Sequence, residues 1–167
     1  MTETRERIAT HVRTDPGVHF NELVRVLGLA PGQVQYHLRR LDWIVEEELY
    51  GQTHYYPPSY NATERRALAL LRRETSADLV ATLLESGPLH ATTLAEQVGI
   101  ARSTLSWHLD RLEEAGLVAE ERDVRNQVVL SLVDRTWTAR LLQRAEPTMP
   151  ERLVDRFTRL LDSLLAE

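Results

Sequence analysis

Apolar residues recur at helical spacing near the start of the chain. Ile8, Ala9 and Val12 fall on one face of a predicted helix over residues 4–14, which the sequence Asp15-Pro16-Gly17 ends. Beyond this point, short apolar segments alternate with turn-forming residues. The pattern predicts, in order, a short strand at residues 18–20, helices over residues 22–27 and 31–42, and a β-hairpin built from residues 45–50 and 54–57.

The two short helices carry signals that start and stop helices. Asn21 is a suitable N-cap for the first, because its side-chain oxygen can accept from the amides of the first turn. Gly28 suits the position after the last residue, where the backbone commonly becomes left-handed. Pro31 suits the first turn of the second helix. We therefore expect two helices joined by a tight turn, followed by a hairpin that turns at residues 51–53.

This unit occurs twice in the chain. Residues 17–41 read GVHFNELVRVLGLAPGQVQYHLRRL, and residues 88–112 read PLHATTLAEQVGIARSTLSWHLDRL. The two segments align without a gap at an offset of 71 residues, which places Gly28 on Gly99. A fixed internal period indicates one structural module built twice.

The repeat organises the rest of the chain. The second copy should hold a helix that starts at Thr75 or Ser76, a short helix that starts at Thr92 or Thr93, a third helix over residues 102–115, and a hairpin over residues 117–121 and 127–132. Helices are also expected over residues 62–73, 135–145 and 151–166. The predicted division is a first module at 1–60, a linker helix at 61–74, a second module at 75–134, and C-terminal helices at 135–167.

Composition excludes several function classes. The 167 residues include no cysteine, which excludes disulfides and thiolate metal sites. The six histidines lack the spacing of zinc ligands, and no phosphate-binding glycine loop or catalytic motif occurs. We therefore expect no enzyme activity, no cofactor and no bound metal. No apolar run approaches the roughly 18 residues of a membrane span, and the charged N-terminus lacks a signal-peptide core, so we expect a cytoplasmic protein.

The strings YHLRRL at residues 36–41 and WHLDRLEEAGLV at residues 107–118 carry a family resemblance. With the helix pair and the hairpin around them, they resemble the third helix and wing of the ArsR/MarR-type winged helix-turn-helix transcription regulators. The double arrangement resembles archaeal tandem winged-helix regulators. This resemblance implies a mainly α fold with small β-hairpin wings (α+β), in which the third helix enters the major groove. The first module has DWIV where the second has EEAGLV, so the two wings should begin differently.

Helical periodicity indicates which face of residues 31–42 is available to DNA. The residues at i, i+3, i+4 and i+7 spacing should face the core, and these are Val34, His37, Leu38 and Leu41. On the opposite face, glutamine can pair with an adenine edge, arginine with a guanine edge, and tyrosine with a phosphate. The candidate DNA-binding residues of this helix are Gln33, Gln35, Tyr36, Arg39 and Arg40.

The equivalent helix of the second module carries a different set. Serine and threonine near a helix N-terminus suit phosphate contacts. For Trp107 the alternatives are a contact with DNA and an anchor for the wing. The candidates on this helix are Ser103, Thr104, Ser106, Trp107 and Arg111. The candidates at the wing tips, where polar loops commonly contact DNA, are Gln52, His54, Arg122 and Arg125.

Charge separates the two modules. The net charge of −5 argues mildly against a nucleic-acid binder, although the distribution of charge matters more. The repeat aligns Arg39 with Asp110 at the centre of the exposed face of each third helix. Residues 1–60 hold 6 arginines and 8 acidic residues, whereas residues 61–134 hold 8 and 12. The first module is therefore the predicted base reader.

His37 and His108 occupy one position of the repeat. A histidine at the edge of a buried helical face is usually a structural hydrogen-bonding group, and the resembling families often carry one there. We expect this role rather than that of a metal ligand or a pH switch.

The last predicted helix is strongly apolar on one side. Such a stripe exceeds what a terminal helix leaves exposed, so it either covers the chain's own modules or pairs with a second subunit. Regulators of the resembling kind commonly dimerise through flanking helices, and we expect a homodimer. The candidate dimerisation residues are Leu153, Val154, Phe157, Leu160, Leu161 and Leu164.

The sequence therefore predicts a sequence-specific transcription regulator that binds double-stranded DNA through tandem winged helices. The alternative is a protein-interaction scaffold, because tandem winged helices also occur in chromosome-segregation accessory subunits and in general transcription factors. The glutamines and arginines on one face of residues 31–42 favour DNA, whereas the net negative charge and Asp110 favour the scaffold. The sequence indicates no particular operator or small-molecule effector.

Overall fold

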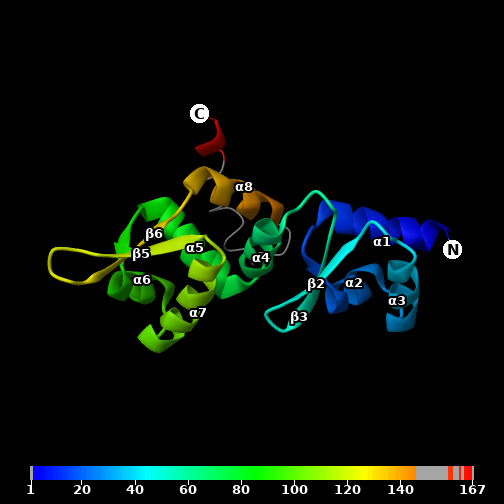
Figure 1. The fold of residues 1–167 in the computed structure, drawn as a ribbon, viewed down its shortest axis with the longest axis horizontal. Coiled ribbons are helices and arrows are strands. Elements are labelled where there is room, and N and C mark those ends of the chain that lie inside the picture. Colours follow the sequence, from blue (N-terminus) through cyan, green and yellow to red (C-terminus); the bar gives the residue numbers. More distant parts are fainter. Residues whose placement is uncertain (1, 146–157, 160–161, 163, 167) are drawn as a thin grey trace. The chain divides into compact units, whose positions relative to one another are not determined.

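The computed structural model describes residues 2–145, 158–159, 162 and 164–166 of the chain. It divides into two compact units, Met1–Ala69 and Leu70–Glu167. Each unit holds a helix, a short strand, two further helices and a β-hairpin in that order (Figure 1). The predicted fold class, mainly α with small β-hairpin wings, is confirmed.

The first unit begins with helix α1 (Thr2–Thr14). The elements that follow are β1 (Val18–His19), α2 (Phe20–Leu27), α3 (Pro31–Arg39), β2 (Val45–Leu49) and β3 (Gln52–Tyr56). The strands form an antiparallel sheet in the order β1-β3-β2. Helix α4 (Ala62–Leu71) spans the boundary between the units, since Ala69 belongs to the first and Leu70 to the second.

The core of the first unit lies between the helices α1, α2 and α3 and the sheet. Ile8, Ala9 and Val12 of α1 are buried, as their spacing predicted. Burying a large apolar side chain stabilises a fold by about 1.5–3 kcal/mol. The central cluster consists of Val12, Val18, Leu23, Val34 and Tyr55, with Phe20, Val24, Leu27, Leu29, Leu38, Trp43 and Ile44 packed around it.

The start of α2 differs from the prediction. Its N-cap is His19, whose Nδ1 accepts from the amide of Glu22 at 3.3 Å, and Asn21 lies inside the helix. His19 has the extended backbone that an N-cap requires because it is also the last residue of β1. The end of α2 follows the prediction, since Gly28 is left-handed at φ 65° and its amide donates to the carbonyl of Val24.

Helix α3 ends at Arg39, before the predicted end at residue 42. The amide of Leu41 donates to the carbonyl of Leu38 at 3.1 Å, three residues back, which tightens the chain into a turn. Trp43 and Ile44 then pack against the core. The first copy has DWIV where the second has EEAGLV, so it is two residues shorter here, and the packing of Trp43 and Ile44 follows directly on the end of the helix.

The hairpin of the first unit turns earlier than predicted. Leu49 pairs with Gln52, which leaves Tyr50 and Gly51 as a two-residue turn. Both have positive φ, 52° and 84°, as the tight turn between twisted strands requires. Gln52 and His54 therefore belong to strand β3 rather than to the turn or its end.

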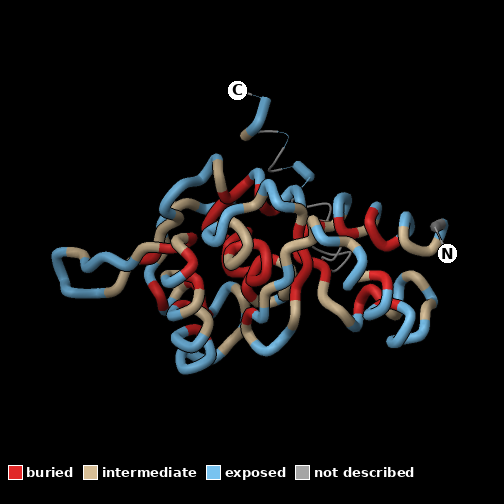
Figure 2. The backbone as a smooth tube through the Cα atoms, turned by 45° about the vertical axis from the view of Figure 1, so that its right-hand side comes forward, coloured by how far each residue is buried: buried red, intermediate tan, exposed pale blue. Residues whose placement is uncertain are grey.

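The second unit repeats this arrangement and adds a helix. Its elements are α5 (Glu74–Ser86), β4 (Leu89–His90), α6 (Ala91–Val98), α7 (Arg102–Glu114), β5 (Val118–Arg122), β6 (Val128–Leu132) and α8 (Arg135–Ala145). The strands form an antiparallel sheet in the order β4-β6-β5. Helix α5 packs against α6, β6 and α8, and all of its residues from Ser76 to Leu84 are buried (Figure 2).

Two helix starts in the second unit differ from the predictions. Helix α5 starts at Glu74 after the N-cap Arg73, ahead of Thr75 and Ser76. Helix α6 starts at Ala91 after the N-cap His90, ahead of Thr92 and Thr93. Neither N-cap makes a side-chain hydrogen bond to its helix. As in the first copy, the chain direction set by the preceding segment decides where the helix begins, and a good capping residue nearby does not.

Helix α8 spans the predicted residues 135–145. The guanidinium of Arg135 donates to the carbonyls of Leu83 and Leu84, at 3.4 and 2.6 Å, and so ties α8 to the end of α5. Most of the helix predicted over 151–166 lies outside the described residues. This includes the candidate dimerisation residues Leu153, Val154, Phe157, Leu160 and Leu161, whereas Leu164 is helical and half-buried.

Candidate nucleic-acid interface

The exposed face of α3 is the candidate reading surface of the first unit. Val34 and His37 are buried, so the opposite side of the helix faces outward as its periodicity predicted. Leu38 and Leu41 are half-buried at the edge of the core. The five candidate residues Gln33, Gln35, Tyr36, Arg39 and Arg40 are all exposed.

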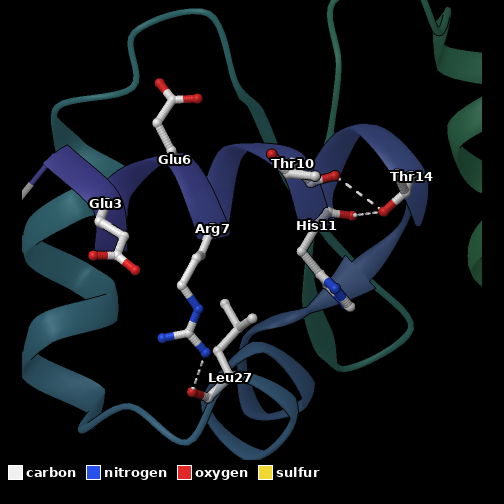
Figure 3. Close-up of a pocket in the computed structure, with 7 residues that line it drawn as sticks. All are labelled: Glu3, Glu6, Arg7, Thr10, His11, Thr14 and Leu27. Carbon is white, nitrogen blue, oxygen red and sulfur yellow. Dashed lines mark hydrogen bonds between the residues drawn. The ribbon is translucent and has the colours of Figure 1, made fainter.

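A hydrogen bond from α1 holds the turn between α2 and α3. The Nη2 of Arg7 donates to the carbonyl of Leu27, the last residue of α2, at 2.9 Å (Figure 3). The carbonyl groups at the end of a helix accept no hydrogen bond from an amide of the same helix, and Arg7 supplies the missing donor here. The Arg7 side chain crosses an open cavity of about 360 Å³, whose other lining residues are Glu3, Glu6, Thr10, His11 and Thr14 of α1.

The side chains on this face of α3 divide into engaged and unengaged groups. The Oε1 of Gln33 accepts from a backbone amide at the start of α3 at 3.1 Å. The guanidinium carbon of Arg40 lies 4.0 Å from the centroid of the Tyr36 ring, a cation–π contact. Gln35 and Arg39 form no hydrogen bond or ion pair with any described residue. These two are therefore the side chains available to an external group.

The third helix of the second unit, α7, presents a different surface. Its candidates Ser103, Thr104, Ser106 and Trp107 are exposed, and Arg111 is half-buried. The guanidinium carbon of Arg111 lies 3.5 Å from the centroid of the Trp107 ring, and its Nη1 donates to the Trp107 carbonyl at 3.0 Å. The Trp107 residue is 54% exposed, so the contact with Arg111 lies on the surface of the helix.

The second half of α7 is acidic. Burial, a hydrogen bond with Glu120 of β5, and the charges of Glu120 and Asp110 raise the pKa of Glu113 to about 7. Asp110, the counterpart of Arg39, is exposed. A phosphate near these carboxylates would be repelled, so this part of α7 is a poor surface for a DNA backbone.

Of the two candidate DNA-binding residues at the wing tip of the first unit, one is exposed and the other is buried. Gln52 is exposed beside the turn. His54 is 1% exposed, and its Nδ1 lies 2.6 Å from the carbonyl of Gly17. The prediction that His54 contacts DNA from the wing tip is therefore wrong, because the earlier turn places this residue within β3, on its buried stretch.

Asp123 organises the wing tip of the second unit. Its carboxylate accepts from two backbone amides of the loop at 2.9 Å each and lies 2.7 Å from the Nε2 of His90. The His90 contact, together with these amides, holds the pKa of Asp123 below its usual value. Arg125 is exposed on this loop, and Arg122 at its base donates to the carbonyl of Asn126 at 2.8 Å.

His37 and His108 are both withdrawn from solvent, His37 almost completely. Burial first, and then the charges of nearby arginines, lower the pKa of both rings. The Nδ1 of His37 has no hydrogen-bond partner within the described residues, which does not support the hydrogen-bonding role expected of it. The two rings instead pack edge-on against Tyr36 and Trp107, with centroid distances of 5.2 and 4.9 Å.

Sequence reasoning passed over two arginines that the structure makes prominent. Arg7 ties α1 to α2, and nothing in the pattern distinguishes it from the other charged residues of α1. Arg102, the first residue of α7, donates to the hydroxyl of Thr92 at 3.0 Å. A cation in the first turn of a helix opposes the helix dipole, and this unfavourable placement is the signal by which Arg102 could have been found.

Within the described residues, no group of three or more His, Cys, Asp or Glu side chains is arranged to hold a metal ion. None of the described helices is long and apolar enough to cross a membrane.

Both units match known helix-turn-helix families. Residues 2–68 match a family described as an N-terminal HTH domain, and residues 70–121 match one described as a helix-turn-helix domain. These are families of DNA-binding proteins rather than of enzymes. The matches cover the two copies of the repeat in turn.

Two curated relatives are described as HTH-type transcriptional regulators. An uncharacterised HTH-type transcriptional regulator of Methanocaldococcus jannaschii is 26% identical over 131 residues, which are 77% of this chain and 33% of the relative. The HTH-type transcriptional regulator NmtR of Mycobacterium tuberculosis is 42% identical over 67 residues, 40% of this chain and 54% of the relative. The chain thus spans a third to about half of the length of these relatives. A solved structure of overoxidised AbfR bound to DNA is similar with a TM-score of 0.42, at 18% identity over 99% of this chain and 98% of that one.

Proposed function

We propose that this chain, which carries two helix-turn-helix domains in tandem, is a transcription regulator that binds double-stranded DNA sequence-specifically, with the first unit as its main base reader. The observation that carries the proposal is the exposed face of α3, on which Gln35 and Arg39 have no partner among the described residues. A glutamine amide and an arginine guanidinium can each make two hydrogen bonds to one base edge. The major groove admits an α-helix, so that both side chains can reach bases together.

The neighbours of these two residues suit contacts with the DNA backbone. Arg40 is held over the Tyr36 ring at the border of the same face, where a phosphate beside the groove would lie. Gln33 remains exposed while its Oε1 caps α3, which leaves its amide nitrogen as a donor. Gln52 on the wing supplies a further polar group.

The second unit is proposed to contribute less to base reading. Arg111 is engaged by Trp107, and the carboxylates of Asp110, Glu113 and Glu120 gather beyond it. Ser103, Thr104 and Ser106 offer hydroxyl groups near the start of α7, and the exposed wing tip offers Arg122 and Arg125. These groups suit contacts that position the protein on the duplex without reading sequence.

A protein-interaction scaffold is the second candidate function. The acidic half of α7 favours it, because a basic protein partner would match these carboxylates better than DNA would. The two functions differ in whether the chain prefers one DNA sequence over others.

Selection from a pool of random duplexes at fixed salt tests the proposal. A sequence-specific regulator enriches a defined sequence, whereas a scaffold enriches none. On the enriched duplex, the double variant Gln35→Ala/Arg39→Ala should lose specific binding, at about 1–3 kcal/mol per lost bidentate contact. The matched double variant Ser106→Ala/Arg111→Ala should lose less. If both variants keep the wild-type circular dichroism spectrum and the second binds more weakly, base reading belongs to the second unit.

A further inference from the structure

Each unit has a cavity between the start of its second helix and its wing. The cavity of the first unit measures about 340 Å³ and includes His19, and that of the second measures about 420 Å³ and includes His90. These histidines are counterparts at the 71-residue offset, and each is the N-cap of its helix. The two cavities therefore occupy the same place in two copies of one module, and they differ in the side chains that line them.

Two arginines line the second cavity. Arg102 reaches it from the first residue of α7, and Arg122 from the last residue of β5. Arg102 donates to the Thr92 hydroxyl at 3.0 Å, and Arg122 to the Asn126 carbonyl at 2.8 Å. Neither guanidinium pairs with a carboxylate of the described residues. Neutral oxygens thus hold both cations in position and leave their charge uncompensated.

The remaining lining of the second cavity also suits an anion. Thr92 and Thr93 belong to the first turn of α6, whose N-cap His90 makes no side-chain hydrogen bond to the helix. The amides of such a turn are donors without intrahelical acceptors at the positive end of the helix dipole. No described carboxylate lines the cavity, and the nearby Asp123 is engaged by His90 and the wing loop.

The first cavity lacks these features. The 71-residue offset places Pro31 at the position of Arg102. The central strand of each sheet, β3 or β6, pairs on one side with β1 or β4 and on the other side with β2 or β5. Counting along the central strand from its pairing with β1 or β4 shows that Glu48 of β2 occupies the position of Arg122 of β5. One cation is therefore replaced by a proline and the other by a carboxylate. No arginine lines the first cavity, and Glu46 does.

We propose that the cavity of the second unit binds one phosphodiester group of the DNA backbone and that its counterpart in the first unit does not. Two fixed guanidinium groups, two hydroxyls and the amides of a helix start are complementary to the oxygens of a phosphate. The proposal rests on the proposed function in one respect, since DNA is the source of the phosphate. The second unit then binds the DNA backbone independently of sequence, while the first unit contacts the bases.

The salt dependence of DNA binding by the full chain tests this assignment. Binding to a duplex of random sequence is followed by fluorescence anisotropy, because such binding reports phosphate contacts and needs no known operator. Arg102→Gln and Arg122→Gln, made separately, should each lower the magnitude of the slope of log K against log salt by up to about 0.9, the value for one lost phosphate. Arg102→Lys keeps the charge and should retain more of the slope than Arg102→Gln.

A matched control separates a local contact from the loss of net charge. Arg140 is exposed on α8 outside the cavity, and Arg140→Gln removes the same charge. This variant should leave the slope unchanged. Equal slopes for Arg140→Gln and the two cavity variants, with all three folded by circular dichroism, would overturn the proposal.

Titration with inorganic phosphate separates the two sources of the anion. At constant ionic strength, phosphate should shift the NMR signals of the Thr92 and Thr93 amides and leave those of Phe20 and Asn21 in the first unit unchanged. Equal shifts in both units, or none, would contradict the assignment. If phosphate shifts Thr92 while Arg102→Gln leaves the DNA salt slope unchanged, the cavity serves a free phosphate ligand and the DNA assignment is wrong. Failure to enrich a sequence from the duplex pool would overturn base reading by α3 and leave these measurements standing.

Discussion

The guanidinium carbon of Arg111 lies 3.5 Å from the centroid of the Trp107 ring, four residues earlier on the same helix. One repeat before, Arg40 stands 4.0 Å over Tyr36 in the same relation. Residues four apart are neighbours on a helix surface, so each pair is a local feature that the module carries in both copies. The stack orders a long cationic side chain on the face that would meet DNA.

The Trp107–Arg111 stack should contribute measurably to stability. Trp107→Ala should lower the free energy of unfolding by about 0.5–1 kcal/mol, the range for an exposed cation–π contact, and Trp107→Phe by less. Urea denaturation of Trp107→Ala, Arg111→Ala and the double variant gives the coupling between the two residues. A coupling of zero would show that the contact between Trp107 and Arg111 does not contribute to stability.

Two glycines of the first unit should respond in opposite ways to alanine. A Cβ at either Gly28 or Gly32 would meet open space, but Gly28 has φ +65° and Gly32 is helical. Gly28→Ala should destabilise the chain by about 1–2 kcal/mol, because an alanine is strained in the left-handed region. Gly32→Ala should stabilise it by roughly 0.5–1 kcal/mol through helix propensity. Urea midpoints measure both, and a loss of similar size at Gly32 would contradict the argument.

Acid should destabilise the chain through His37. Burial lowers its pKa below the unfolded value of 6.5, so the unfolded state binds more protons than the folded state as the pH falls below 6.5. The stability is therefore full above pH 6.5 and declines between 6.5 and the lower pKa of the folded state. His37→Gln should show a smaller drop in urea midpoint between pH 7.5 and 5.5 than the wild type. The same drop in both would remove His37 as the cause.

Glu113 should act in the opposite direction. Its pKa is raised to about 7, so the folded state holds a proton that the unfolded state has lost, and the stabilisation from this proton disappears as the pH rises from about 4.5 through 7. Glu113→Gln should therefore raise the thermal midpoint relative to the wild type at pH 8. Glu114→Gln, at the exposed neighbouring position, is the matched control and should not. Equal gains in both variants would point to net charge alone.

The apolar stripe of the last predicted helix should make the chain a dimer. Burying this stripe between two subunits is favourable by about 25 cal/mol for each Å² of apolar area. Light scattering should show a dimer for the full chain and a monomer for a chain that ends at Ala145. A stable dimer of the shortened chain would rule out the stripe from Leu153 to Leu164 as the interface.

Much of the fold follows from the repeat, but the helix starts do not. Periodicity predicts the order of elements and the left-handed Gly28. Capping preferences favoured Asn21 and Thr92, whereas His19 and His90 are the N-caps. These histidines end short strands, so pairing with the wing gives them the extended backbone of a cap. The turn at Tyr50 was missed for a similar reason, since a tyrosine at φ 52° is held there by the sheet and not by its own preference.

The candidate site was predictable to a similar extent. Spacing indicates which residues of α3 face outward, but not that Gln33 caps the helix and Arg40 stacks, which leaves Gln35 and Arg39 unengaged. That distinction depends on side-chain geometry. The meeting of Arg102 with Arg122 depends on the wing folding back to the start of α6, and no local pattern contains it.

The burial of α5 sets how freely the two copies of the module can change. Every residue from Ser76 to Leu84 is enclosed, whereas α1 keeps an outer side on which Glu6, Thr10 and Arg13 meet solvent. Polar replacements can accumulate on that side of α1 without disturbing a core. In α5 nearly every replacement alters packing on some side. The first helix of the module thus has a wide mutational tolerance in one copy and a narrow one in the other.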